Sequence, residues 1–345
     1  LVGVLSAAYA AEASSDGIWK ALLDAPPQVE MSKARKAALE ALDGWLARPN
    51  SERSEECIAY YRNAVDRVIQ LLKTERPKKG IRIFQLYSSS VVVQSPSCVF
   101  ALDLDQGPNE DLHKTPEEEG VPLCMTDNQV ADLADLLDYS FHTHEHADHI
   151  DYEITKALID RDKTVVTTES AKAIWANEPW SQKILTLPQT LGEAKGAGKL
   201  AVNTLSDHQW NNDAHTSGTP CNAYVITTPE GVTVATKGDI NCALQFYGWL
   251  NVLLEKGCSI DVITGSPVYW HGVNLTREID EILKPLWLSG HNWEFVHRHS
   301  GEAYGNASPF SRSYSLLHGM AKSGRTSVLS WSEYIDVPQG KGAHR

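Results

Sequence analysis

A short histidine-rich stretch is the part of this sequence best suited to metal chemistry. Four histidines and one aspartate fall between residues 142 and 149. Imidazole and carboxylate groups are the side chains that zinc prefers in catalytic sites. We expect His144 and His146, two residues apart, to share one metal ion, and Asp148 and His149 to face a neighbouring ion. The alternative is a solvated loop or an adventitious metal-binding tract, which would not require the Asp-His ending.

Hydrophobic spacing predicts an N-terminal helical region over residues 16–80. Residues 34–47 are rich in strong helix formers, and apolar residues between 58 and 72 recur at spacings of three and four. The break at residues 77–80 contains proline and glycine, so we place a domain boundary there.

The pattern then changes to strands, which predicts a separate α/β domain over residues 81–345. Short β-prone runs occupy residues 81–87, 90–94 and 98–104, and a further strand, 139–141, leads directly into the histidine-rich stretch. Helices and strands then alternate, with a hairpin at 223–228 and 232–236 and a last predicted strand at 286–289. This alternation favours a layered α/β fold over an all-β one.

The run Thr143-His144-x-His146-x-Asp148-His149 resembles the T-H-x-H-x-D-H motif of the metallo-β-lactamase superfamily. The resemblance extends in element order over about residues 81–340. It implies an αββα sandwich whose metal ions lie at one edge of two sheets, on loops that follow strands. Residues 1–80 would be a helical extension outside that pattern.

The resemblance also implies three further ligands. His208 is our choice for the third histidine, because it follows a predicted strand at 201–205, and His215 is its competitor. Asp239, in a Gly-Asp pair after the hairpin, would bridge the ions. His291 would be the last ligand, with His297 and His299 as alternatives. The first site would then hold His144, His146 and His208, and the second Asp148, His149 and His291.

This ligand set implies two divalent ions, with zinc preferred and manganese or iron as alternatives. A hydroxide that bridges them would attack the substrate, and Asp148 would orient it and carry its proton. The expected function is hydrolysis of a small ester, lactone, amide or phosphodiester. The alternatives are a non-catalytic metal- or ligand-binding protein and a β-lactamase. A di-iron redox protein of this fold would carry glutamate in place of His146.

Aromatic residues near the expected ligands are candidates for the substrate pocket, with ordinary core packing as the alternative. The candidates for substrate contact are Trp210, Tyr269, Trp270, His271 and His215.

Composition restricts the partners and the location of the 345-residue chain. The formal net charge of −13 disfavours nucleic-acid binding, and no apolar run reaches the ~20 residues of a membrane span. The small-x-small run Ala8-Tyr9-Ala10 is typical of a signal-peptide end, so residues 1–15 are either such a remnant or an N-terminal helix. We expect a periplasmic or secreted protein, otherwise a cytoplasmic one. The six cysteines form no C-x-x-C pair, and either disulfides or free thiols fit them.

Overall fold

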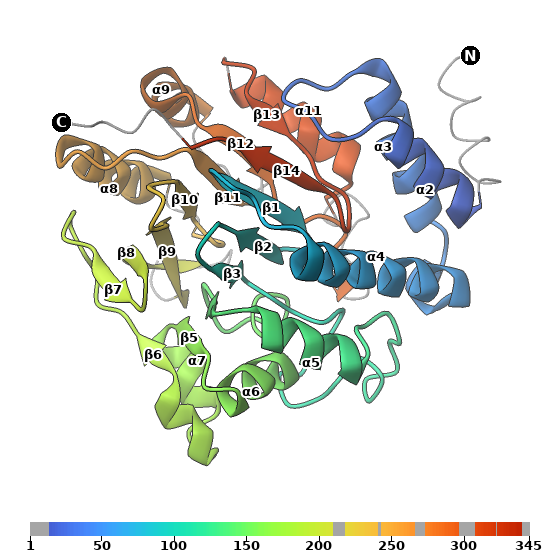
Figure 1. Cartoon of the computed structure of the whole chain (residues 1–345), viewed down its shortest axis with the longest axis horizontal. Coiled ribbons are helices and arrows are strands. Elements are labelled where there is room, and N and C mark those ends of the chain that lie inside the picture. Colours follow the sequence, from blue (N-terminus) through green and yellow to red (C-terminus); the bar gives the residue numbers. More distant parts are fainter. Residues whose placement is uncertain are drawn as a thin grey trace.

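The computed structural model describes residues 14–209, 218–240, 243–265, 273–296, 308–321 and 323–339 (Figure 1). All but the last two residues of the expected leader, 1–15, lie outside these ranges. None of the described helices is long and apolar enough to cross a membrane.

The described part of the N-terminal region contains three α-helices, drawn in blue in Figure 1: α2 (Ser15–Asp24), α3 (Lys33–Leu46) and α4 (Glu55–Thr74). Each begins after a serine, Ser14, Ser32 or Ser54, whose hydroxyl accepts a hydrogen bond from a backbone N–H of the first turn. Such a cap satisfies an amide that a helix start leaves unpaired. Helices therefore form most of residues 15–74, and their apolar faces are turned towards the first sheet.

The first sheet has seven strands in the order β14-β1-β2-β3-β4-β5-β6. The strands from β14 to β3 pair antiparallel, and those from β3 to β6 pair parallel. Its strands are β1 (Ile81–Gln85), β2 (Val91–Gln94), β3 (Val99–Leu102), β4 (Tyr139–Phe141), β5 (Thr164–Thr167), β6 (Leu185–Thr186) and β14 (Tyr334–Val337). The helices between them are α5 (Asp127–Leu136), α6 (Tyr152–Asp160) and α7 (Glu169–Ile174).

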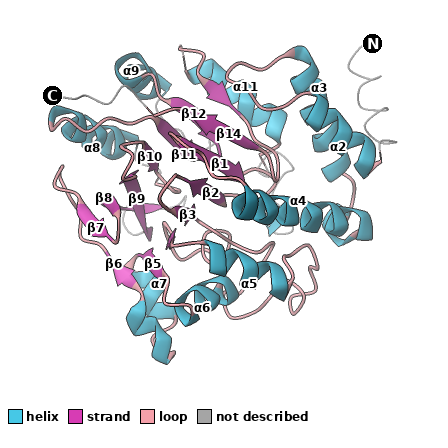
Figure 2. Cartoon of the chain, in the orientation of Figure 1, coloured by secondary structure: helices cyan, strands magenta, loops and turns pink. Residues whose placement is uncertain are grey.

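The second sheet also has seven strands, in the order β13-β12-β11-β10-β9-β8-β7. Strands β10 to β13 pair parallel, whereas β7 to β10 pair antiparallel. Its strands are β7 (Lys195–Ala197), β8 (Leu200–Gln209), β9 (Thr219–Thr227), β10 (Thr233–Thr236), β11 (Val262–Gly265), β12 (Leu286–Ser289) and β13 (Thr326–Ser327). The associated helices are α8 (Ala243–Glu255), α9 (Val273–Leu283) and α11 (Phe310–Met320) (Figure 2).

Side chains alternate between the two faces of each strand and so build three apolar layers. In β1, Ile83 lies in the core between the sheets, whereas Phe84 lies in the core under the helices. In β12, Leu286 belongs to the core between the sheets and Trp287 to the core under α8, α9 and α11. The layers are therefore helices, sheet, sheet and helices, which confirms the predicted αββα sandwich.

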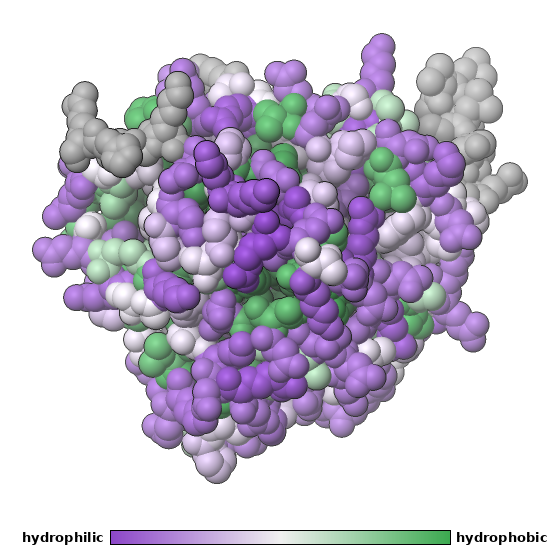
Figure 3. Space-filling view, in the orientation of Figure 1, coloured by the Kyte–Doolittle hydropathy of each residue, from purple (hydrophilic) through white to green (hydrophobic). Residues whose placement is uncertain are grey.

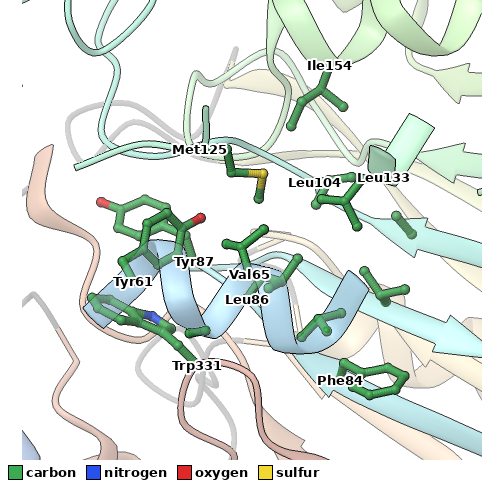
Figure 4. Close-up of a cluster of buried hydrophobic side chains, with 14 of the residues drawn as sticks. Tyr61, Val65, Phe84, Leu86, Tyr87, Leu104, Met125, Leu133, Ile154 and Trp331 are labelled. Atoms are coloured by element: carbon green, nitrogen blue, oxygen red, sulfur yellow. The ribbon is translucent and has the colours of Figure 1, made fainter. Parts of the chain in front are cut away.

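Helices α2 to α4 share one continuous core with the outer face of the first sheet. Figure 4 shows Tyr61 and Val65 of α4 in the same cluster as Leu86, Leu133 and other buried side chains. These helices thus cover the outer face of the first sheet. The surface in Figure 3 is mostly hydrophilic, with hydrophobic side chains in small separate patches.

A buried aspartate of α3 connects the N-terminal helices to the C-terminal part of the chain. Asp43 Oδ1 accepts hydrogen bonds from Trp293 Nε1 at 2.7 Å and from the Phe310 amide at 2.9 Å. Asp43 Oδ2 accepts one from the Ser311 amide at 2.9 Å. Trp293 is fully buried here, so it serves core packing and does not line the cavity beside the expected ligands.

Replacing Asp43 with alanine should lower the free energy of unfolding by about 3 kcal/mol or more, because three donors lose their acceptor. Asp24→Ala, on the solvent face of α2, removes an exposed pair with Lys20 and is the matched control, expected to change little. Urea unfolding curves of both variants measure the difference. Equal midpoints for the two variants would contradict this role for Asp43.

Five of the six cysteines are free thiols in the described residues: Cys57, Cys98, Cys124, Cys221 and Cys258. Cys242 lies outside them. Among the five, the free-thiol alternative is the one that the structure supports.

Candidate metal centre

Strand direction brings four loops of the chain to one edge of the sandwich. Strands β3 and β4 of the first sheet are parallel, as are β10, β11 and β12 of the second. The carboxyl ends of parallel strands meet at one edge of a sheet. The loops after β3, β4, β10 and β12 carry Asp103, the histidine-rich stretch, Asp239 and His291 respectively.

Asp148, His149 and His291 form one group of potential metal ligands. One ligand atom from each lies within 4.8 Å of the others. His291 Nε2 is 2.8 Å from Asp148 Oδ2, and His149 Nε2 is 3.4 Å from the same oxygen. These are the three residues expected for the second metal site.

A second group contains His144, His149 and Asp239, again within 4.8 Å of one another. Asp239 Oδ2 lies 3.6 Å from His149 Nε2 and 3.9 Å from His291 Nε2. The Asp239 carboxylate therefore lies next to both groups, the position that a bridging ligand needs. His146 lies beside His144, with ring centroids 4.6 Å apart.

His208 is not brought to these groups. The strand that was predicted to end at residue 205 continues to Gln209, so His208 lies within β8 and not after it. Its side chain is 52% exposed, and its nearest carboxylate is that of Asp207, at 3.8 Å. The next residue reaches the site instead, because Gln209 Nε2 donates a hydrogen bond to Asp239 Oδ2 at 3.1 Å.

His215 and the other predicted pocket residues, Trp210, Tyr269, Trp270 and His271, lie outside the described residues. The chain returns to the site just after His215, because Thr219 Oγ1 is 3.3 Å from His146 Nε2. The described residues on either side of His215, Gln209 and Thr219, both lie beside the ligand groups, which makes His215 a better candidate for the third histidine than the exposed His208.

We accordingly expect His215→Ala to lose one equivalent of metal and His208→Ala to retain it, which reverses the choice made from sequence. Metal analysis of the two variants beside the unchanged protein measures this difference. Retention of full metal in His215→Ala together with loss in His208→Ala would restore the original assignment.

Asp103, at the end of β3, holds the ligand loop in place. Its Oδ2 is 3.1 Å from His149 Nδ1, and its Oδ1 accepts a hydrogen bond from the Thr143 amide at 2.7 Å. The Thr143 hydroxyl lies 3.0 Å from His144 Nδ1. Such contacts fix the ring orientation and leave the other nitrogen, Nε2, available to hold a metal ion. Sequence reasoning missed Asp103, although its place after a buried strand parallel to β4 could have indicated it.

Gly238 allows the turn that carries Asp239 to lie against the histidine-rich loop. Its φ is +52°, and a Cβ added there would lie 2.6 Å from Thr143 Cβ. The left-handed conformation and the close approach both require glycine. His291 has a φ of +58°, a strained conformation for a side chain with a Cβ and one that is found at functional sites.

Gly238→Ala should lower the amount of metal bound per chain, because the added methyl group would push the turn that carries Asp239 away from Thr143. Gly231→Ala is the control: its φ is +80°, but nothing lies within 4 Å of the added Cβ. Both variants lose about 1 kcal/mol of stability from the backbone conformation, and only Gly238→Ala should lose metal. Equal metal contents in the two variants would contradict this function of Gly238.

The charges of the ligand cluster favour a bound cation. Burial lowers the pKa of His144 well below its usual value, and His149 lowers it further, so His144 is neutral. Burial also lowers the pKa of His149, but Asp148, Asp239 and Asp103 outweigh that effect and raise it well above the usual value. The three carboxylates therefore favour a positive charge beside His149, and a bound metal ion would supply it in place of a proton.

The residues present fit a metal ion. His144 Nε2 is buried and has no hydrogen-bond partner among the described residues, a costly arrangement unless a ligand occupies that position. The surrounding donors are imidazole nitrogens and carboxylate oxygens, the set that suits zinc, manganese or iron.

A cavity of about 330 Å³ opens beside the ligands. Four acidic residues line it: Glu110, Glu145, Asp148 and Glu294. His146 also lines this cavity, so two of the expected ligands contact both the metal groups and the space where a substrate would lie.

Two face-to-face sheets with groups of potential metal ligands on loops at one edge define the class: this chain has the metallo-β-lactamase fold. Among solved structures it is similar to an isothiocyanate hydrolase from Delia radicum gut bacteria, at 16% identity and a TM-score of 0.51 over 75% of this chain and 99% of that one. It is also similar to a possible metal-dependent hydrolase from Veillonella parvula DSM 2008, at 12% identity and a TM-score of 0.52. That match covers 75% of this chain and 99% of the other. At these identities the likeness shows the fold alone. No family model and no curated protein sequence matches the chain.

Proposed function

We propose that this protein is a hydrolase that binds two divalent metal ions, zinc by preference, through the cluster around His149. The observation that supports this most is the convergence of His144, Asp148, His149, Asp239 and His291 beside an open cavity. Two such ions supply water of lowered pKa and stabilise negative charge on the attacked group.

Asp148 has the position of the proton carrier. Its Oδ2 belongs to the ligand group with His149 and His291, and its side chain also lines the cavity. A carboxylate held there accepts a proton from the attacking water and delivers it to the leaving group. The histidines would bind the metal in their neutral forms, while Asp103 and Thr143 keep the rings of His149 and His144 in place.

The cavity lining favours a neutral or cationic substrate. The lining residues include Glu110, Glu145 and Glu294 but no lysine or arginine among the described residues. Such a lining repels anions. Of the expected substrate classes, a neutral ester, lactone or amide therefore fits better than a phosphodiester. A neutral isothiocyanate joins this list through the likeness to the isothiocyanate hydrolase.

The test is a hydrolysis screen of the metal-loaded protein against p-nitrophenyl acetate, a small lactone, benzyl isothiocyanate, nitrocefin as a β-lactam and bis-p-nitrophenyl phosphate. We expect metal-dependent turnover of a neutral substrate and a slower rate, or none, with the phosphodiester. Turnover that survives removal of the metal, or no turnover of any of these compounds, would overturn the proposal and favour a non-catalytic binding protein.

A further inference from the structure

A second cavity of about 330 Å³ lies between the N-terminal helices and the segment around β14. Its wall includes Trp19 and Pro26 of the α2 region, Tyr60 and Arg67 of α4, and Trp331. It shares no lining residue with the cavity beside the metal centre. Nothing in the proposed hydrolysis uses it.

Four buried polar atoms gather in the wall of this cavity without a hydrogen-bond partner among the described residues. They are Tyr60 Oη, Ser330 Oγ, Trp331 Nε1 and Ser332 Oγ. The four residues are at most 4% exposed. Folded proteins leave few such groups unpaired, because each costs about 1–3 kcal/mol. A polar ligand or ordered water in the cavity is what could pair with groups at this place.

Arg67 supplies the cationic side chain in the lining of this cavity. Two carboxylates line it, but Glu333 is paired with Arg35, with Nη1 2.6 Å from Oε1, and Asp336 is paired with Arg82, with Nε 2.7 Å from Oδ1. Arg67 has no ion-pair partner among the described residues. Its guanidinium carbon lies over the Trp19 ring, 5.4 Å from the centroid.

The wall also contains several aromatic rings, among them Trp19, Tyr60 and Trp331. The Trp19 and Tyr60 rings meet edge to face with centroids 5.3 Å apart, and Tyr60 and Trp331 lie 6.2 Å apart. Such rings offer an apolar surface to a ligand, while the hydroxyl and indole N–H groups can donate hydrogen bonds to an acceptor. The volume is that of a site for a small molecule.

We propose that this cavity is a binding site for a small organic carboxylate with an aromatic or alkyl body. The carboxylate lies against Arg67 and accepts hydrogen bonds from the unpaired donors. The apolar body packs against Trp19 and Tyr60. The alternative is that ordered water alone occupies the cavity. A carboxylate site should bind a charged probe more tightly than a neutral one, whereas a water-filled cavity should not distinguish them.

The experiment uses the metal-loaded full chain and three probes of one shape: 3-phenylpropionate, 3-phenylpropan-1-ol and 3-phenylpropylamine. Isothermal titration should show binding of the carboxylate, at least tenfold weaker binding of the alcohol, and none of the amine. Equal affinity for all three, or binding of none, would overturn the proposal and leave water as the occupant.

Variants identify the place of binding. Arg67→Gln and Tyr60→Phe should each weaken the binding of 3-phenylpropionate about tenfold. Arg48→Gln is the matched control, because Arg48 also lies over a tryptophan, at 5.3 Å from the Trp45 ring centroid, but outside this cavity. Asp148→Asn should bind the probe unchanged. Loss of binding in Asp148→Asn, with retention in Arg67→Gln, would place the probe at the metal centre and contradict the inference.

Discussion

Replacing Asp148 with asparagine should reduce turnover of any substrate by about a thousandfold while the fold stays intact. Asparagine keeps the size of the side chain but removes the negative charge and the proton acceptor. General acid–base catalysis alone contributes roughly 10²–10⁴-fold. The stability of the variant should change little, because Asp148 lies on a loop and belongs to none of the three apolar cores.

Glu145→Gln is the matched control for this experiment. Glu145 lies in the same loop and lines the same cavity, but it is absent from both ligand groups. The kcat/KM, bound metal and thermal midpoint of both variants should be measured together. A normal rate in Asp148→Asn, or an equal loss in Glu145→Gln, would refute the assignment of the proton carrier.

Removing the metal should abolish activity and lower the thermal midpoint by several degrees. Without a cation, the carboxylates of Asp103, Asp148 and Asp239 all lie around His149, and only its protonation balances them. A ligand present at 100 times its Kd stabilises the folded state by about 2.7 kcal/mol per site. Dialysis against dipicolinate, followed by addition of zinc, should remove and then restore both activity and stability.

Asp239→Asn distinguishes metal loss from a direct effect of the chelator. Its carboxylate lies next to both ligand groups, so the variant should bind less metal and its midpoint should respond less to dipicolinate. A midpoint that falls equally in the variant and in the unchanged protein would show that the chelator acts elsewhere.

Much of the candidate centre follows from local sequence. His144, Asp148 and His149 share one short loop, and Asp239 and His291 each follow a predicted strand closely. The resemblance to the metallo-β-lactamase motif implied these positions before the sheets were seen, and the parallel strands of the structure place their carboxyl ends at one edge. The helices of the N-terminal region were equally predictable, since their apolar spacing is local.

Other features depend on contacts between distant segments. Sequence alone did not predict β7, β13, β14 or α11, which are short strands or a helix defined by long-range packing. Helices α2 to α4 cover the first sheet, and Asp43 is buried against Trp293. Both features arise from packing between segments that are far apart in the sequence. Neither pattern is visible within a window of neighbouring residues.

The position of His208 shows most clearly what could not be predicted from the sequence. The sequence by itself determined that a strand begins near residue 200 and that a histidine follows. Only the tertiary structure decided where the strand ends, because pairing with β9 continues through His208 opposite Pro220 and Gln209 opposite Thr219. Successive side chains of a strand point to opposite faces, so this extension turns Gln209 towards Asp239 and leaves His208 exposed. The end of a strand is set by its partner, and the partner begins ten residues further along the chain.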